Sequence, residues 1–365
     1  MVALITEVMR TAWGNPSAAH PQGAAARSHI ETARRRLLAA LGDPDGSHGD
    51  LVWTSGCTEA DALAVTGAAR VRPGAVVVSS IEHPAVASTA RRLGDIGRSV
   101  VEVAPGPDGV LDPDAIAEAA ASHSAAVVAV VMVQNEVGVV QPVAAIASAV
   151  KRRVPGCHVH VDAAQALGKI AIDVASLGAD TIAVAGHKLH GPKGTGALWL
   201  RRGVALEPLW VGGGQQHGLR GGTQDAPGAA GFGLAAERAI AAMPAARTRW
   251  LELAQAVTSV LDERGVRYRQ LVPDVRRAPH ILALAIAGVP AAALRTVLAS
   301  RGVYLSTGSA CADRDAKPSA VLTALGMDAD AGMVRLSFGL DTTLDEVTTA
   351  AARLADVALE LARAA

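Results

Sequence analysis

A lysine in a glycine-rich turn is the first residue of this sequence that could carry chemistry. Lys188 lies in the segment Ala185-Gly-His-Lys-Leu-His-Gly-Pro-Lys-Gly194, directly after a β-prone run, and is one of only five lysines in the chain. Open α/β sheets bind ligands at the carboxyl ends of their strands, and a lysine placed there can form a Schiff base with an aldehyde cofactor. On this segment alone, an ordinary surface lysine in a turn is the alternative.

An acid at the end of an earlier strand makes the choice of cofactor more specific. The segment His158-Val-His-Val-Asp-Ala-Ala-Gln165 places Asp162 directly after an apolar run. Pyridoxal phosphate needs an anion beside its pyridine nitrogen, so that the ring stays protonated and can act as an electron sink. Asp162 suits that role, and Gln165 could hydrogen-bond the phenolic oxygen of the same cofactor. The alternative for Asp162 is a helix N-cap.

Two further segments could hold other parts of such a cofactor. Thr54-Ser-Gly-Cys-Thr-Glu59 predicts a strand–turn–helix junction, whose exposed amides bind phosphate well and to which Thr58 adds a hydroxyl. A plain capping box is the alternative there. His83, in Ser80-Ile-Glu-His-Pro-Ala85, stands at a strand end where an imidazole could stack on the cofactor ring. A purely structural histidine is the competing interpretation.

The cysteines indicate which reaction such a cofactor would serve. The chain has three cysteines and no Cys-x-x-Cys pair, so neither a disulfide framework nor a structural metal site is predicted. Cys57 and Cys157 fit the usual pattern of core cysteines. Cys311 does not, because Ser306-Thr-Gly-Ser-Ala-Cys-Ala-Asp313 has the small residues of a mobile loop. A flexible thiol that can reach a cofactor-bound substrate is a candidate nucleophile.

Taken together, these segments resemble the cysteine desulfurases of the NifS/IscS type, which have the class V aminotransferase-like fold (pyridoxal-phosphate fold type I). The resemblance covers nearly the whole chain, from Gly14-Asn-Pro-Ser17 to Arg335-Leu-Ser-Phe-Gly339. The matching pieces are TSGCTEADALA, SIEHPAV, NEVGVVQPV, HVDAAQALGK, GHKLHGPKGTGAL, GLRGGT, STGSACA and RLSFG. Each piece is weak alone, and the set is highly specific. The loop around Cys311 resembles that of the subgroup with a long mobile cysteine loop.

The resemblance implies a role for each matching residue. Lys188 would hold pyridoxal 5'-phosphate covalently and later move protons, and His83 would stack on the ring. Asp162 would pair with the pyridine nitrogen and Gln165 with the phenolic oxygen. The phosphate would be bound by Thr58, by His187 and, from the partner subunit of a homodimer, by Thr223. The substrate carboxylate would be held by Asn135 and Arg335.

The resemblance further implies that the substrate is L-cysteine and that Cys311 takes its sulfur as a persulfide, leaving L-alanine. The sulfur would then pass to an acceptor protein, such as a cluster scaffold, a thiolation enzyme or a DNA-sulfur-modification enzyme. Alternatives are a selenocysteine lyase, another pyridoxal-phosphate enzyme of the same fold, or a catalytically weakened scaffold in a sulfur-transfer complex. The sequence departs from the family at Ala185, where a serine often adds a phosphate hydrogen bond. Val2 is expected to lie already in a helix, without the short strand that usually comes before it.

These residues must be positioned by alternating strands and helices. Strands are expected at residues 51–54, 75–78, 125–133, 158–161, 181–185 and 197–200, and helices at 28–41, 58–70, from about 83, and 143–152. Such alternation predicts an α/β fold, with a mostly parallel seven-stranded-type sheet flanked by helices. A glycine-rich loop follows at 212–222, and then a long helical region over 226–264 with a break near Pro244.

The last hundred residues predict a smaller α+β domain. Strands are expected at 281–286 and 334–338, and helices at 291–300 and 344–363. We therefore expect a large pyridoxal-phosphate-binding domain over 12–245 and a small C-terminal domain over 246–365, joined by residues 1–11. Basic and acidic residues number 34 each, so the charge gives no case for binding nucleic acid or a membrane surface. With no apolar run approaching a membrane span and no signal-peptide pattern, a cytoplasmic protein is expected.

Overall fold

Valine-rich runs form the central strands of the larger sheet, because helices cover both faces of these strands. Every residue is buried in β2 (Val76–Ser79), β4 (Val127–Val131), β5 (His158–Asp162) and β6 (Thr181–Ala185). The computed structural model describes residues 1–307, 319–327 and 332–364. Cys311, the predicted nucleophile, therefore lies outside the described residues.

The chain divides into two compact units, each built from more than one segment. The first comprises Met1–Val103, Leu111–Val133 and Gln141–Ala241. The second comprises Ala104–Val110, Gln134–Val140 and Ala242–Ala365. Two short segments of the second unit therefore interrupt the sequence of the first.

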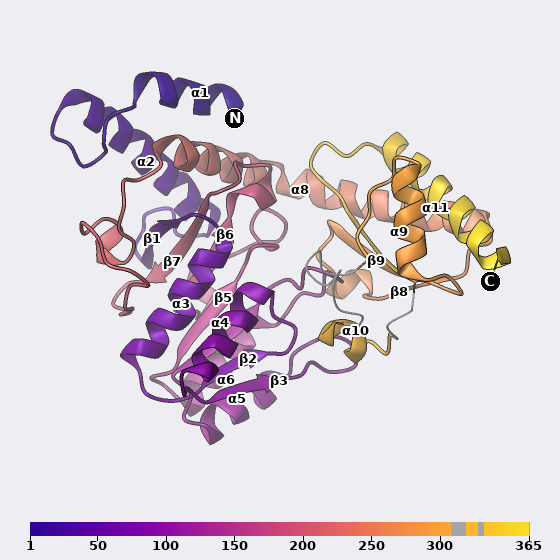
Figure 1. Ribbon diagram of the computed structural model, residues 1–365, viewed down its shortest axis with the longest axis horizontal. Coiled ribbons are helices and arrows are strands. Elements are labelled where there is room, and N and C mark those ends of the chain that lie inside the picture. Colours follow the sequence, from indigo (N-terminus) through magenta and orange to yellow (C-terminus); the bar gives the residue numbers. More distant parts are fainter. Residues whose placement is uncertain (308–318, 328–331, 365) are drawn as a thin grey trace. The chain divides into compact units, whose positions relative to one another are not determined.

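The first unit contains a seven-stranded sheet with the order β1-β7-β6-β5-β4-β2-β3 (Figure 1). Its other strands are β1 (Gly49–Thr54), β3 (Val100–Val103) and β7 (Gly196–Arg201). The five strands from β6 to β3 are parallel, and β7 runs antiparallel to both of its neighbours. The predicted α/β fold with a mostly parallel sheet is thus confirmed. Because β4, β5 and β6 are parallel, their carboxyl ends meet at one edge of the sheet.

Helices of the first unit cover this sheet with small and branched side chains. They are α1 (Val2–Thr11), α2 (Pro21–Ala40), α3 (Cys57–Val71), α4 (Pro84–Asp95), α5 (Pro113–Ser122), α6 (Val143–Arg153), α7 (Val174–Leu177) and the first part of α8 (Ala226–Glu263). Leu63 of α3 packs with Val52 and Leu198 in one buried cluster. Alanines let α3 approach the strands closely, and α3 contacts β4, β5, β6 and β7. This helix therefore begins directly over the centre of the sheet.

The second unit contains a three-stranded antiparallel sheet in the order β10-β9-β8. Its elements are the later part of α8, β8 (Tyr268–Gln270), β9 (Ile281–Ile286), α9 (Ala291–Ser300), α10 (Ala320–Ala324), β10 (Gly332–Ser337) and α11 (Leu344–Ala364). Trp250 of α8, Leu284 of β9 and Leu354 of α11 are all buried in its core. Strands β9 and β10 pair in an antiparallel register that places Arg335 opposite Ala283.

Most predicted elements lie within a few residues of the observed ones, and one prediction is wrong. Helix α8 continues through Pro244 without the predicted break. Helix α5 and strands β3 and β8 were not predicted, because they are short or lack a strong apolar period. Among the described residues, no helix is long and apolar enough to cross a lipid bilayer.

Candidate active site

Asp162 is the last residue of β5 and marks the edge of the sheet where the candidate site is built. The side chain is buried, with 4% of its surface exposed. Its Oδ1 accepts a hydrogen bond from the Ala164 backbone N–H at 2.9 Å and one from the Cys57 thiol at 3.6 Å. Burial raises the pKa of Asp162, while the Ala164 N–H, His83, Cys57 and Lys188 favour the ionised form. The alternative role as a helix cap is excluded, because the next helix along the chain begins only at Val174.

Lys188 lies beyond the end of the neighbouring strand. β6 ends at Ala185, and the chain turns into a short 3-10 helix, Gly186–Leu189, which carries the half-buried Lys188. In the register of β5 and β6, Asp162 lies beside Ala183. The Lys188 ammonium group lies within electrostatic reach of the Asp162 carboxyl and favours its ionised form. This is the electrostatic relationship that a Schiff-base lysine and a pyridine-binding acid would have.

His83 is the third residue near Asp162 and Lys188, and it follows another strand of the sheet. It follows β2 and caps α4, where its Nδ1 accepts a hydrogen bond from the Ala85 N–H at 3.1 Å. Partial burial lowers the pKa of His83, Asp162 raises it, and Lys188 lowers it further. The structural interpretation of this histidine is therefore confirmed, because it caps a helix; it also lies within electrostatic reach of Asp162 and Lys188, and its stacking on a cofactor ring stays a prediction.

The amino end of α3 lies on the same side of the sheet and presents exposed polar groups. β1 ends at Thr54, the helix begins at Cys57, and Thr58 in its first turn is exposed. Close packing fixes this turn, since a Cβ on Gly196 of β7 would lie only 2.5 Å from the carbonyl carbon of Gly56. Exposed amides at a helix start favour an anion. Only half of the alternative capping box is present: Glu59 Oε2 accepts the Ser55 N–H at 2.7 Å, but the N-cap residue is Gly56 and no side chain caps the helix start.

Two other predicted phosphate ligands lie in loops of this unit. His187 is exposed beside Lys188, and burial together with Lys188 and Lys193 lowers its pKa. Thr223 is exposed in the glycine-rich loop and lines a cavity of about 210 Å³ together with Thr54 and Ser55. Arg220 connects that loop to α3, because its Nε lies 2.9 Å from Glu59 Oε1. The cavity therefore adjoins the junction between β1 and α3.

The residues of the first unit fit pyridoxal phosphate by their chemistry. An acid, an amine and an imidazole interact at one sheet edge, Gln165 is half-buried three residues after the acid, and the start of α3, which carries no side-chain cap, follows β1 at the same edge. The acid matches the ring nitrogen, the amine matches the aldehyde and the helix start matches the phosphate. The structure therefore places the predicted ligands Asp162, Lys188 and His83 together.

The two predicted substrate ligands lie in the second unit and contact each other. Arg335 of β10 donates from its NH1 group to the backbone carbonyl of Asn135 at 2.6 Å. Its Nε is buried and has no hydrogen-bond partner among the residues that the structure describes. Burial lowers the pKa of Arg335, and the neighbouring Glu136 raises it. A buried guanidinium N–H without an acceptor is a donor available to an anionic ligand.

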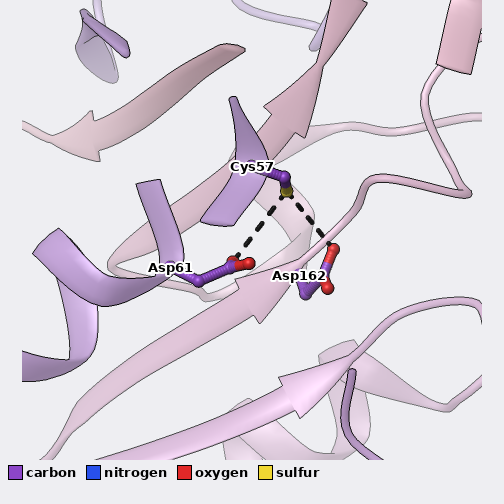
Figure 2. A group of neighbouring side chains, drawn as sticks. All are labelled: Cys57, Asp61 and Asp162. Carbon is purple, nitrogen blue, oxygen red and sulfur yellow. Dashed lines mark hydrogen bonds between the residues drawn. The ribbon is translucent and has the colours of Figure 1, made fainter. Parts of the chain in front are cut away.

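Sequence reasoning missed a buried polar group directly behind Asp162. Cys57, expected to be a core cysteine, is half-buried, packs against the core and also hydrogen-bonds Asp162 (Figure 2). Asp61 is one helical turn further along α3, and His160 Nε2 lies 3.1 Å from its Oδ1. The expectation holds for Cys157, which is 1% exposed. A signal existed, since Cys57 and Asp61 share one face of α3 at a spacing of four residues.

Glu82 is a further buried acid next to His83. Its carboxylate accepts from the Ser79 hydroxyl and from the Val131 N–H at 2.8 Å, so it ties β2 to β4. Burial raises the pKa of Glu82 to about 8. This acid supports the strand ends that carry the site, and nothing in its sequence context distinguished it from a surface glutamate.

Known proteins share this arrangement along almost the whole chain. The model of the family described as Aminotransferase class-V matches residues 2–349. The cysteine desulfurase IscS 1 of Archaeoglobus fulgidus is 34% identical over 352 residues, covering 95% of this chain and 90% of that protein. A solved NifS-like protein has a TM-score of 0.87 at 29% identity, covering 99% of this chain and 95% of the other. The structure titled SspA in complex with cysteine has a TM-score of 0.79 at 29% identity, with coverages of 94% and 95%.

Proposed function

The chain belongs to the aminotransferase class-V family and is a pyridoxal-phosphate-dependent cysteine desulfurase of the NifS/IscS type, and we propose that Cys311 receives the sulfur. The overall reaction converts L-cysteine and the Cys311 thiol into L-alanine and a Cys311 persulfide. One sulfur–carbon bond breaks and one sulfur–sulfur bond forms, so the atoms balance without an external oxidant. The persulfide then delivers its outer sulfur to an acceptor protein.

One observation carries this proposal. Asp162, Lys188 and His83 follow three different strands of one sheet and still interact electrostatically at a single edge. An acid near an amine, with basic neighbours that favour its ionised form, is the arrangement that a pyridine nitrogen and an aldehyde require. Lys188 would hold the aldehyde carbon, Asp162 the ring nitrogen and Gln165 the phenolic oxygen. Thr58, His187 and Thr223 would hold the phosphate. When bound, the cofactor supplies an electron sink for the negative charge that develops at the substrate Cα.

Four further tasks fall to side chains of the protein: binding the substrate, moving its Cα proton, covering the ring and accepting the sulfur. Arg335, with its buried Nε, would pair with the substrate carboxylate, and Asn135 would add a polar contact beside it. The Lys188 amine would remove the proton from the substrate Cα. His83 would cover the ring and limit water access. Cys311 must react as a thiolate, because a cysteine with an ordinary pKa of about 8.5 is only slightly ionised near neutrality.

Two partners complete the proposal. The enzyme would act as a homodimer in which Thr223 of each chain contributes to the phosphate site of the other, since a two-fold interface places two equivalent sites together. The sulfur acceptor would be a protein with its own reactive thiol, because a persulfide transfers sulfur by attack of a thiolate.

A direct test combines product analysis with mass spectrometry. The purified holoenzyme is incubated with L-cysteine, alanine is quantified, and peptides are mapped without reductant. We expect alanine to form together with a mass increase of one sulfur on the peptide that contains Cys311. Absence of alanine, or a persulfide on Cys57 or Cys157, would contradict the proposed function.

A further inference from the structure

A chain of buried polar side chains lies directly behind the acid that would bind the ring nitrogen. The Cys57 sulfur is 3.6 Å from Asp162 Oδ1 and 4.0 Å from Asp61 Oδ1, so it lies between the two carboxyl groups (Figure 2). Asp61 Oδ1 in turn lies 3.1 Å from His160 Nε2, and His160 Nδ1 lies 2.9 Å from the Thr181 hydroxyl oxygen. Asp61 and His160 are completely buried, whereas Cys57 is half-buried.

The two acids of this chain differ in what supports their charge. Asp162 has a backbone N–H, the Cys57 thiol and two basic neighbours that favour its ionised form. Asp61 has no basic neighbour that is charged, because burial lowers the pKa of His160 to about 3. Burial and the neighbouring acids Asp162 and Glu82 raise the pKa of Asp61 well above its ordinary value, and its Oδ2 is buried with no hydrogen-bond partner among the described residues. Asp162 is therefore the acid of this cluster whose ionised form has more support from its neighbours, although burial raises its pKa too.

The thiol has one proton and two possible acceptors, and charge decides between them. Burial raises the pKa of Cys57 well above its ordinary value, and both acids raise it further, so the sulfur keeps its proton. Hydrogen bonds to an ionised acceptor are stronger than those to a neutral one. The thiol therefore donates to Asp162, which is the nearer acceptor and the acid whose charge has more support.

A metal ion is the competing use of this cluster. One ligand atom each of Cys57, Asp61 and Asp162 lies within 4.8 Å of the others. Cysteine binds metals as the thiolate, however, and this thiol is surrounded by groups that oppose its ionisation. A thiol that keeps its proton is a hydrogen-bond donor and a poor metal ligand.

We propose that Cys57 is a positioning residue for Asp162, whose Oδ1 it holds together with the Ala164 N–H so that Oδ2 is presented to the ring nitrogen of the cofactor. Both hydrogen bonds that described residues donate to Asp162 go to Oδ1. The inference rests on the proposed role of Asp162 and adds a residue that acts only through it.

This role predicts a specific pattern of substitutions. Cys57→Ala removes the donor with little change in backbone preference at the first residue of α3. Cys57→Ser keeps a donor at nearly the same place. Cys157→Ala is the matched control, because Cys157 is a buried cysteine of the same unit whose thiol donates to the His158 carbonyl and not to an active-site acid.

The test is a double-mutant cycle read by cofactor binding. The apparent Kd for pyridoxal phosphate is measured by visible absorbance for wild type, Cys57→Ala, Asp162→Asn and the double variant, and circular dichroism checks folding. We expect Cys57→Ala to weaken binding about fivefold in the wild-type background, as loss of one such hydrogen bond would, and to have no effect in the Asp162→Asn background. Cys57→Ser should restore binding to within about twofold of wild type, and Cys157→Ala should bind like wild type.

Equal effects of Cys57→Ala in both backgrounds would overturn the proposal, because a residue that only packs against the core acts independently of Asp162. A serine variant as weak as the alanine variant would overturn it too. Alanine formation from cysteine is measured separately on the wild-type holoenzyme. Failure of that reaction would contradict the proposed function, while the cycle would still decide whether Cys57 acts through Asp162.

Discussion

Arg335 and Asn135 are two hundred residues apart in sequence, and the guanidinium NH1 of Arg335 donates to the Asn135 backbone carbonyl at 2.6 Å. The Arg335 backbone also pairs with Ser306, which precedes the segment that contains Cys311. The bond to Asn135 orients the planar guanidinium, and the buried Nε has no acceptor within the described part of the chain. A preoriented fork of this kind suits a carboxylate.

Arg335→Lys is expected to raise the KM for cysteine by about tenfold to a hundredfold, because a lysine cannot replace a bidentate contact worth roughly 1.5–3 kcal/mol. Steady-state alanine formation over a range of cysteine concentrations measures this. Binding of pyridoxal phosphate should be unchanged, as judged by visible absorbance. Arg264→Lys is the control, since Arg264 pairs with Asp356 at the surface of the same unit. An unchanged KM would exclude Arg335 from substrate binding.

Lys188→Ala should abolish covalent attachment of the cofactor. Borohydride reduction of the wild-type holoenzyme, followed by peptide mapping, should find the cofactor on Lys188. Lys193→Ala is the control, because Lys193 is exposed in the same turn and should keep both attachment and turnover. Attachment to Lys169 or Lys193 instead would make the assignment wrong.

Cys311→Ser should bind the cofactor and cysteine and change the visible spectrum, since these steps use the lysine and the cofactor. It should nevertheless release less than about one hundredth of the wild-type alanine, because a hydroxyl is a far weaker nucleophile than a thiolate. Cys157→Ser should retain turnover apart from a stability loss caused by a hydroxyl in a packed position. Substantial alanine formation by Cys311→Ser would favour another reaction of the same fold.

Thr223 lines a cavity beside Ser55 of its own chain, so its assignment to the partner's phosphate site needs a test in trans. Thr223→Asp should weaken cofactor binding at least tenfold, because a carboxylate repels the phosphate. Mixing this variant with the inactive Lys188→Ala variant, under conditions that exchange subunits, should recover about a quarter of the wild-type activity, one complete site per mixed dimer. No recovery in the mixture, or a monomer in sedimentation, would place Thr223 in its own site.

Glu82 should make the enzyme less stable as the pH rises. Its pKa is about 8 in the folded protein, whereas 4.5 is its ordinary value, so the folded state retains a proton that the unfolded state has lost. The contribution of Glu82 to the free energy of unfolding is complete below about pH 4.5. It is lost progressively as the pH approaches 8, by at most about 1.4 kcal/mol per pH unit.

Glu82→Gln should remove this dependence and keep the acceptor for the Ser79 hydroxyl and the Val131 N–H. Urea unfolding of the holoenzyme at pH 6 and pH 8 gives the free energy of unfolding at each pH. The loss of this free energy between pH 6 and pH 8 should be about 2 kcal/mol smaller in the variant than in wild type. Glu118→Gln is the control, because Glu118 is exposed and its pKa is lowered by Ser122 and Arg153. An equal pH dependence in wild type and Glu82→Gln would exclude Glu82 as its source.

The sequence by itself indicated the α/β fold, most strands, and the residues Asp162, Lys188 and His83, because each of these depends on local order. An apolar run followed by an acid or a glycine-rich turn predicts a strand and a polar residue at its end, and parallel strands bring such ends to one edge. The same local reasoning failed at Pro244, where α8 is continuous.

Only the tertiary structure decided which side chains from other elements contact those residues. Whether Cys57 only packs in the core or also supports Asp162 depends on the angle at which α3 crosses β5, and no pattern within α3 encodes that distance. The same holds for Asp61 and His160, 99 residues apart, and for Arg335 and Asn135. Charges at these positions depend on burial and on neighbours from other elements. Periodicity reports which face of an element is apolar, and only the packed chain sets which polar groups share one low-dielectric environment.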